Sequence, residues 1–197
     1  MSHIANLLIS RRSVRKYSEE LLSPEETELI LQAALLSPTS KNSHSWEFII
    51  IEEKEMLQKL SMCKPESGKF IANAALAIVV IGNPLLSDVW IEDASIASFA
   101  MQMQAEDIGI KSCWVQVRNR NFSETITSGE HLNDLLNIPM PLEVLSIVSF
   151  GKSQKPRSPH DVDSLLWEKM HIGKYELGSN DSELSDQVFW LLNYHYA

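Results

Sequence analysis

The sequence has only two cysteines, Cys63 and Cys113, among its 197 residues. They stand far apart, whereas a structural zinc site needs clustered cysteines or histidines and a disulfide framework needs more cysteines. The sequence therefore excludes a disulfide-stapled fold and offers no cysteine-based metal site. We expect both cysteines to be reduced thiols, as in a cytoplasmic protein.

Positive charge is scarce. The sequence has 17 lysines and arginines but 26 aspartates and glutamates, so the net charge is −9. Proteins that bind nucleic acid usually carry a basic face, so we expect no nucleic-acid partner. Apolar runs are short as well, and none approaches the about 20 residues of a membrane span. The first apolar stretch precedes its arginines, the reverse of a secretory signal. We expect a cytoplasmic protein with no membrane partner.

The remaining composition, 44% hydrophobic and 22% charged, is typical of a globular protein with a core of its own. Two capping boxes predict helix starts, one at Ser23 with Glu26 and one at Thr127 with Glu130. Apolar patterning predicts helices at 3–10, 24–36, 53–63, 92–108 and 127–137, and strands at 46–51, 74–81, 112–117 and 142–150. These elements indicate a mixed α+β or α/β domain.

The end of the sequence, from residue 178, is first polar and then aromatic. Such a segment needs an apolar surface on which to lie. One interpretation is a last helix that packs on its own domain. The other is an arm that wraps around a partner subunit, since aromatic residues are enriched at interfaces. We divide the chain into a domain over 1–177 and an extension over 178–197.

Three polar segments are candidates for binding. Residues 11–16 (RRSVRK) hold four cations, whose forked guanidinium groups suit phosphate, although a solvated basic turn would look the same. Residues 37–46 (SPTSKNSHSW) form a polar loop before a buried strand and offer donors to a heteroaromatic ligand or to its polyol. Residues 151–157 (GKSQKPR) place a second basic cluster after a strand. Taken singly, the last two also fit ordinary surface loops.

Taken together and in this order, these segments closely resemble the FMN-dependent nitroreductase family. Further motifs agree with the resemblance, namely Asp93 at the start of an Ala- and Met-rich helix, the run 106–114 (EDIGIKSCW) and the run 166–169 (LWEK). The resemblance covers about residues 3–175. One departure is the second loop, in which His44-Ser45 replaces the family's usual Gln-Pro before the tryptophan.

The resemblance implies an α+β fold with three α/β/α layers, a central, mostly antiparallel sheet flanked by helices, and a domain-swapped type of homodimer. It implies two FMN molecules at the dimer interface, each touched by both subunits, and C-terminal segments that embrace the partner. FMN would bring the redox chemistry itself, so no catalytic triad is expected, and none is visible.

The resemblance also assigns cofactor-binding positions. The N-terminal motif and the segment after the last strand would contact the phosphate, the ribityl chain or the ring edge. The ring would lie against the third strand. The 37–46 loop would border the flavin of the other subunit. The expected residues are Arg11, Arg12, Ser13, Arg15, Pro38, Thr39, Ser40, Asn42, Lys69, Trp114, Val115, Gln116, Gly151, Lys155 and Arg157.

The resemblance therefore implies a ping-pong oxidoreductase that takes hydride from NADH or NADPH and passes electrons to a nitroaromatic, a quinone or a related acceptor. The sequence has no G-x-G-x-x-G fingerprint, which agrees with a nicotinamide that stacks on flavin rather than lying in a Rossmann crevice. An alternative with the same fold is an FMN-binding storage or sensor protein with little turnover. A third alternative is a globular protein without flavin, whose basic loops are merely solvated.

Overall fold

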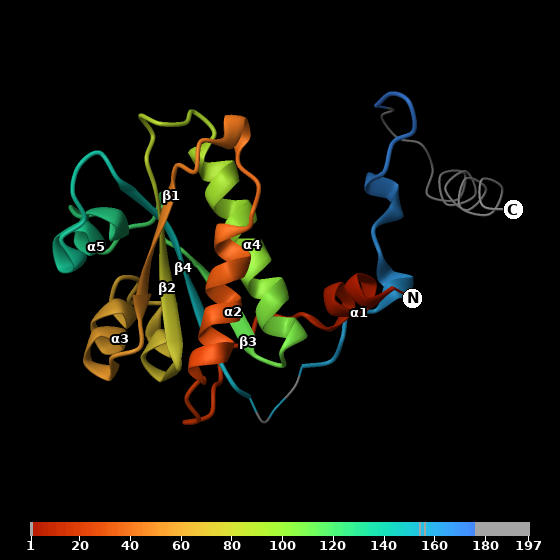
Figure 1. Cartoon of the computed structure of the whole chain (residues 1–197), viewed down its shortest axis with the longest axis horizontal. Helices are drawn as coiled ribbons and strands as arrows, with labels where there is room; N and C mark the ends of the chain where they lie inside the picture. The colour runs from red at the N-terminus through yellow and green to blue at the C-terminus, as the bar shows by residue number, and fades with distance from the viewer. Residues whose placement is uncertain (1, 154, 156, 176–197) are drawn as a thin grey trace, which may run out of the picture. The chain divides into compact units, whose positions relative to one another are not determined.

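The structure is a computed structural model, which describes residues 2–153, 155 and 157–175 (Figure 1). The chain divides into two compact units, the first ending at Pro159 and the second beginning at His160. The first unit contains α1 (His3–Ser10), α2 (Pro24–Leu35), β1 (Trp46–Ile51), α3 (Lys54–Ser61), β2 (Leu76–Gly82), α4 (Trp90–Asp107), β3 (Lys111–Gln116), α5 (Ser128–Leu136) and β4 (Glu143–Gly151). Short 3-10 turns lie at Ser40–Asn42, Lys69–Asn73, Val162–Ser164 and Trp167–Lys169.

The four strands form one sheet in the order β1-β2-β4-β3, and every neighbouring pair is antiparallel. Strands β2 and β4 occupy the centre, and β2 is buried over its whole length. This burial explains its unbroken apolar sequence. Strand β3 is an edge strand, so one side of its backbone does not face another strand of this sheet.

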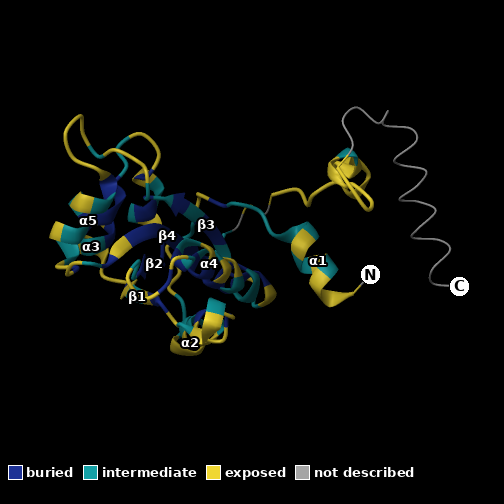
Figure 2. Cartoon of the chain, turned by 90° about the horizontal axis from the view of Figure 1, so that it is seen from above, coloured by how far each residue is buried: buried dark blue, intermediate teal, exposed yellow. Residues whose placement is uncertain are grey.

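Helices cover both faces of the sheet (Figures 1 and 2). On one face, Ile30 of α2 and Met101 of α4 pack with Ile78 and Phe150 in a core cluster. On the other face, Leu57 of α3 and Leu132 of α5 belong to a second cluster. The predicted α+β fold with a flanked antiparallel sheet is therefore confirmed, including its three layers.

Both predicted capping boxes are present. The Ser23 side chain accepts from the Glu26 N–H while the Glu26 side chain accepts from the Ser23 N–H, and Thr127 and Glu130 do the same for α5. The other helix and strand ends lie within about two residues of those predicted, the usual scatter of such boundaries. The 3-10 turns were not predicted, because they lack the apolar periodicity of a longer helix.

Two predictions about chain organisation remain untested. The boundary at 177/178 and the aromatic segment after it lie outside the described residues. Within the described residues, no helix is both long and apolar enough to cross a membrane.

The buried thiol of Cys63 predicts a loss of stability at high pH. Burial raises the pKa of Cys63 from 9.0 to about 11. The folded protein thus holds this proton more tightly than the unfolded chain, so the associated stability is complete below about pH 9 and is lost as the pH rises toward 11. The free energy of unfolding should fall by up to about 3 kcal/mol from this group. Urea denaturation between pH 9 and 11 should show a smaller fall in the free energy of unfolding for Cys63→Ala than for the parent. Equal falls in the two proteins would contradict the assignment.

Candidate functional site

The N-terminal basic motif is held as an extended segment across the ends of two strands. The Val14 N–H donates to the Ser112 carbonyl of β3 at 3.0 Å, and the Ser18 N–H donates to the Lys152 carbonyl beyond β4 at 2.8 Å. Ser13 also forms a parallel bridge with Ser112. Because side chains alternate along an extended chain, every second residue of this segment points to the same side.

Four predicted binding residues meet around the Cys113 thiol. Burial raises the pKa of Cys113, while Arg15, a hydrogen bond with Ser13, Arg11 and Arg157 all act to lower that pKa. The charges of the three arginines therefore reach the same thiol on β3, although Arg157 is distant in sequence. We call these four residues the arginine cluster.

Arg12, the alternate residue of the same segment, has different partners. Its guanidinium donates to the Ser158 carbonyl and to the Pro159 carbonyl, the latter at 3.4 Å. These bonds tie the N-terminal motif to the segment that carries Arg157. The assignment of Arg12 to cofactor binding remains a prediction, and the structure shows this side chain bonded to the two residues that follow Arg157.

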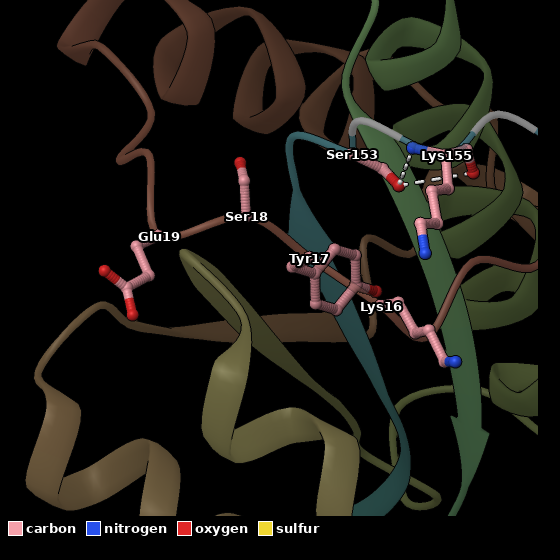
Figure 3. Close-up of a pocket in the computed structure, with 6 residues that line it drawn as sticks. All are labelled: Lys16, Tyr17, Ser18, Glu19, Ser153 and Lys155. Carbon is pink, nitrogen blue, oxygen red and sulfur yellow. Dashed lines mark hydrogen bonds between the residues drawn. The ribbon is translucent and has the colours of Figure 1, made fainter.

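Lys155 lies in a separate hollow beside the cluster. This pocket has a volume of about 480 Å³ and is lined by Lys16, Tyr17, Ser18, Glu19, Ser153 and Lys155 (Figure 3). Lys155 is anchored through its backbone, since its N–H donates to Ser153 Oγ at 3.4 Å. Lys155 and Lys16 bring two cations to the pocket, whereas Glu19 brings an opposing carboxylate.

Gly151 ends β4 where the Tyr17 ring packs against the backbone. A β-carbon at this position would lie 2.8 Å from Tyr17 Cδ1, which is closer than real contacts allow. The Tyr17 hydroxyl lies 2.8 Å from Ser149 Oγ, and burial raises the pKa of Tyr17. The structure thus explains this glycine by Tyr17 packing, while its predicted contact with a cofactor remains a prediction.

The predicted ring-binding residues lie on the open edge of the sheet. The Ser112 carbonyl faces outward to Val14, so the peptide groups of Trp114 and Gln116 face outward too, because strand residues alternate. Val115 faces β4 instead and is only 4% exposed. The Trp114 indole N–H donates to Gln116 Oε1 at 3.0 Å, which fixes both side chains. Outward N–H groups at these two positions are therefore candidates for hydrogen bonds to a ligand.

The surroundings of Lys69 also connect to the arginine cluster. Lys69 is exposed at the start of a 3-10 turn, and its neighbour Phe70 lies under the Arg15 guanidinium, 5.7 Å from ring centroid to Cζ. This cation–π contact brings the 69–70 backbone next to Arg15. Neither Phe70 nor Tyr17 was predicted as a site residue from the sequence. Tyr17 continues the odd-numbered alternation of the basic motif, which is a signal that was available in the sequence.

The loop with Pro38, Thr39, Ser40 and Asn42 lies at the opposite end of the sheet. Strand register places Trp46, which follows this loop, level with Glu143 through β2, whereas Ser112 is level with Phe150. Seven strand residues separate these levels, about 23 Å along the strands, and three strand spacings add about 14 Å across the sheet. Within one chain, the loop and the arginine cluster are therefore far apart.

Comparison with known proteins agrees with this geometry. A sequence model described as the nitroreductase family matches residues 8–74. An Archaeoglobus fulgidus protein with the provisional name NADH dehydrogenase/NAD(P)H nitroreductase is 35% identical over 83% of this chain and 92% of its own length. The chain belongs to the nitroreductase family. The resemblance seen in the sequence is thereby confirmed.

Solved structures extend the match to the whole fold. An FMN-dependent nitroreductase from Clostridium difficile R20291 has a TM-score of 0.85 and 40% identity, and the alignment covers 87% of this chain and 99% of that one. A nitroreductase family protein from Clostridium difficile 630 has a TM-score of 0.73 and 27% identity, covering 89% and 100%. The family fold therefore accounts for nearly all of these relatives' length.

Gly151→Ala tests the packing of the basic segment against β4. The new methyl group should push Tyr17 away and lower the free energy of unfolding by about 1–3 kcal/mol, measured by urea denaturation. Gly129→Ala is the matched control, because a β-carbon there meets only Thr127 Oγ1 at 3.9 Å. In a Tyr17→Ala background the loss from Gly151→Ala should shrink. An undiminished loss would show that Tyr17 is not the obstacle.

Proposed function

We propose that this protein is an FMN-dependent oxidoreductase that takes reducing equivalents from NADH or NADPH and delivers them to a nitroaromatic, a quinone or a related small acceptor in a ping-pong cycle. The observation that carries the proposal is the arginine cluster beside the outward backbone N–H groups of β3. The names of the A. fulgidus and C. difficile relatives support the same activity. We further propose that it works in the cytoplasm.

The arginine cluster fits a phosphate group. Arginine forks bind phosphate oxygens bidentately, and the Ser13 hydroxyl adds a further donor. Arg11, Arg15 and Arg157 come from two distant segments, so their positive charges would neutralise a dianion locally even though the protein is acidic overall. Lys155 is placed to add a longer-range attraction from the neighbouring pocket.

The open edge of β3 fits a flat ring with polar edges. Such a ring needs an apolar floor and a few fixed donors. The outward N–H groups of Trp114 and Gln116 would supply the donors, and the half-buried Trp114 side chain would supply apolar surface. When bound, FMN would supply the hydride and electron transfer chemistry itself. The protein's part is to bind, orient and shield the ring.

The position of the 37–46 loop supports a site shared by two subunits. Its predicted ring contacts, Ser40 and Asn42, lie at the other end of the sheet from the arginine cluster of the same chain. A second copy, related by a two-fold axis, would bring its loop to the first copy's cluster. We therefore propose a homodimer in which each FMN is held by the arginines of one chain and the loop of the other.

Removal of one arginine from the cluster should weaken FMN binding. Arg11→Ala or Arg157→Ala removes a charge-assisted hydrogen bond worth about 1.5–3 kcal/mol, which corresponds to about a 10- to 150-fold loss of affinity. Titration of the apoprotein with FMN, followed by fluorescence quenching, measures this loss. Arg120→Ala is the control, because Arg120 is exposed and its guanidinium donates to the carbonyl of the neighbouring Asn119. Unchanged affinity in both cluster variants would contradict the phosphate assignment.

Mixed dimers test whether the site is shared. Arg15→Ala and Asn42→Ala subunits, co-expressed with two different tags and purified through both, should form dimers with one intact site. Such dimers should recover about half of the parent's NAD(P)H oxidation with a quinone acceptor, whereas each homodimer is impaired. If the mixed dimer recovers no NAD(P)H oxidation, Arg15 and Asn42 of one chain serve the same site.

A further inference from the structure

The loop between α2 and β1 has a strained backbone. Lys41, Asn42 and His44 adopt positive φ angles of 52°, 55° and 45°. Asparagine tolerates this conformation, but for Lys41 and His44 it costs about 1–2 kcal/mol each, so neighbouring contacts must impose this shape. The loop also holds Asn42, which the proposed function places against the flavin. The contacts that impose the loop's shape therefore bear on the site.

One buried carboxylate holds the loop on both sides of Lys41 and Asn42. Asp93, in the first turn of α4, is only 3% exposed. Its Oδ1 accepts from the Ser40 N–H at 2.9 Å, and its Oδ2 accepts from the Ser43 hydroxyl at 3.3 Å. These two donors immediately precede and follow Lys41 and Asn42. Asp93 thus brackets two of the three left-handed residues, Lys41 and Asn42, while His44 follows directly after Ser43.

The other contacts of the loop are local or lie at its borders. The Asn42 N–H donates to the Thr39 carbonyl at 3.2 Å, and the His44 N–H donates to Thr39 Oγ1 at 3.2 Å. They shape the turn but do not attach it to a helix. Asp93 provides that attachment, and the positive end of α4 favours a carboxylate at this place. The loop therefore takes its orientation from the long central helix of the domain.

We propose that Asp93 is a positioning residue that orients the Ser40–Asn42 turn for the flavin bound by the partner subunit. This inference rests on the proposed shared flavin site. Asp93 does not itself touch the cofactor in this account. It acts through the Ser40 backbone and the Ser43 hydroxyl, and it transmits the rigidity of α4 to the turn.

Two substitutions separate the hydrogen bonds from the charge. Asp93→Asn keeps an acceptor for the Ser40 N–H, and its amide can donate to Ser43 Oγ, so FMN affinity should stay within about threefold of the parent. Asp93→Ala removes both acceptors and leaves the partly buried Ser40 N–H without this partner, so the affinity should fall about 5- to 100-fold. Ser98→Ala is the matched control. Ser98 is also buried on α4, but its hydroxyl donates to the Ala94 carbonyl of the same helix. The FMN affinity of Ser98→Ala should therefore equal that of the parent.

Mixed dimers distinguish positioning from a general loss of stability. The measured quantity is FMN bound per dimer at limiting FMN. An Asp93→Ala subunit paired with an Arg15→Ala subunit should regain one site. The damaged loop of the first subunit and the damaged cluster of the second belong to the same site, so the other site is intact. An Asp93→Ala subunit paired with Asn42→Ala should regain none, because both changes damage the loop. Ser43→Ala replaces Asp93→Ala if the latter does not fold, with the same expected pattern.

Each outcome bears on one claim. Recovery with Arg15→Ala but not with Asn42→Ala supports Asp93 as a positioning residue of the loop. Recovery with both partners, or with neither, overturns it, as does a loss in Asp93→Asn equal to that in Asp93→Ala. If the Arg15→Ala and Asn42→Ala subunits fail to complement each other, the shared site itself fails, which is a separate result.

Discussion

The attachment of residues 13–18 across the ends of β3 and β4 is the constraint on which the site depends. Two backbone hydrogen bonds, from Val14 to Ser112 and from Ser18 to Lys152, fix the register of this segment. With the register fixed, alternation decides which side chains face Cys113 and which face away. A shift by one residue would turn Arg11, Ser13 and Arg15 away from the open edge of β3. Gly151 helps to maintain this register, because it leaves room for the Tyr17 ring.

The same constraint explains how an acidic protein brings several arginines to bear on one place. The net charge of −9 is a sum over the whole molecule. The charges of Arg11, Arg15 and Arg157, by contrast, act together at one place, the Cys113 thiol. Their convergence even acts on the buried thiol of Cys113, whose pKa is raised by burial and lowered in part by these cations. Arg12 contributes differently, because its bonds to the Ser158 and Pro159 carbonyls secure the segment that carries Arg157.

Much of the fold could be predicted from local patterns. The Ser23 and Thr127 capping boxes and the unbroken apolar strand over 76–82 have causes that lie within a few residues of sequence. The antiparallel pairing came from the family resemblance, whereas the strand order β1-β2-β4-β3 was not predicted, because no local pattern specifies which strands become neighbours. The 3-10 turns escaped prediction for the opposite reason, since they are too short to show a period.

The candidate site was only partly predictable. Its residue types were visible in the motifs, but the meeting of Arg157 with Arg11 and Arg15 depends on the ends of β3 and β4 lying together. The partners of Arg12, the stacking of Arg15 over Phe70 and the anchoring of the loop by Asp93 are likewise long-range contacts. The separation of the loop from the arginine cluster emerges only from strand register, and it is the physical reason to infer a second copy at the site.

The central claim is that this fold binds FMN and passes reducing equivalents from NAD(P)H through it. The most direct test is the anaerobic visible spectrum of the full chain after FMN has been added and the excess removed, recorded before and after addition of NADH or NADPH. We expect a retained flavin band that bleaches rapidly with at least one of the two. A band that persists with both would contradict the oxidoreductase activity and favour a binding or sensing role, and a protein that retains no band would contradict the cofactor itself.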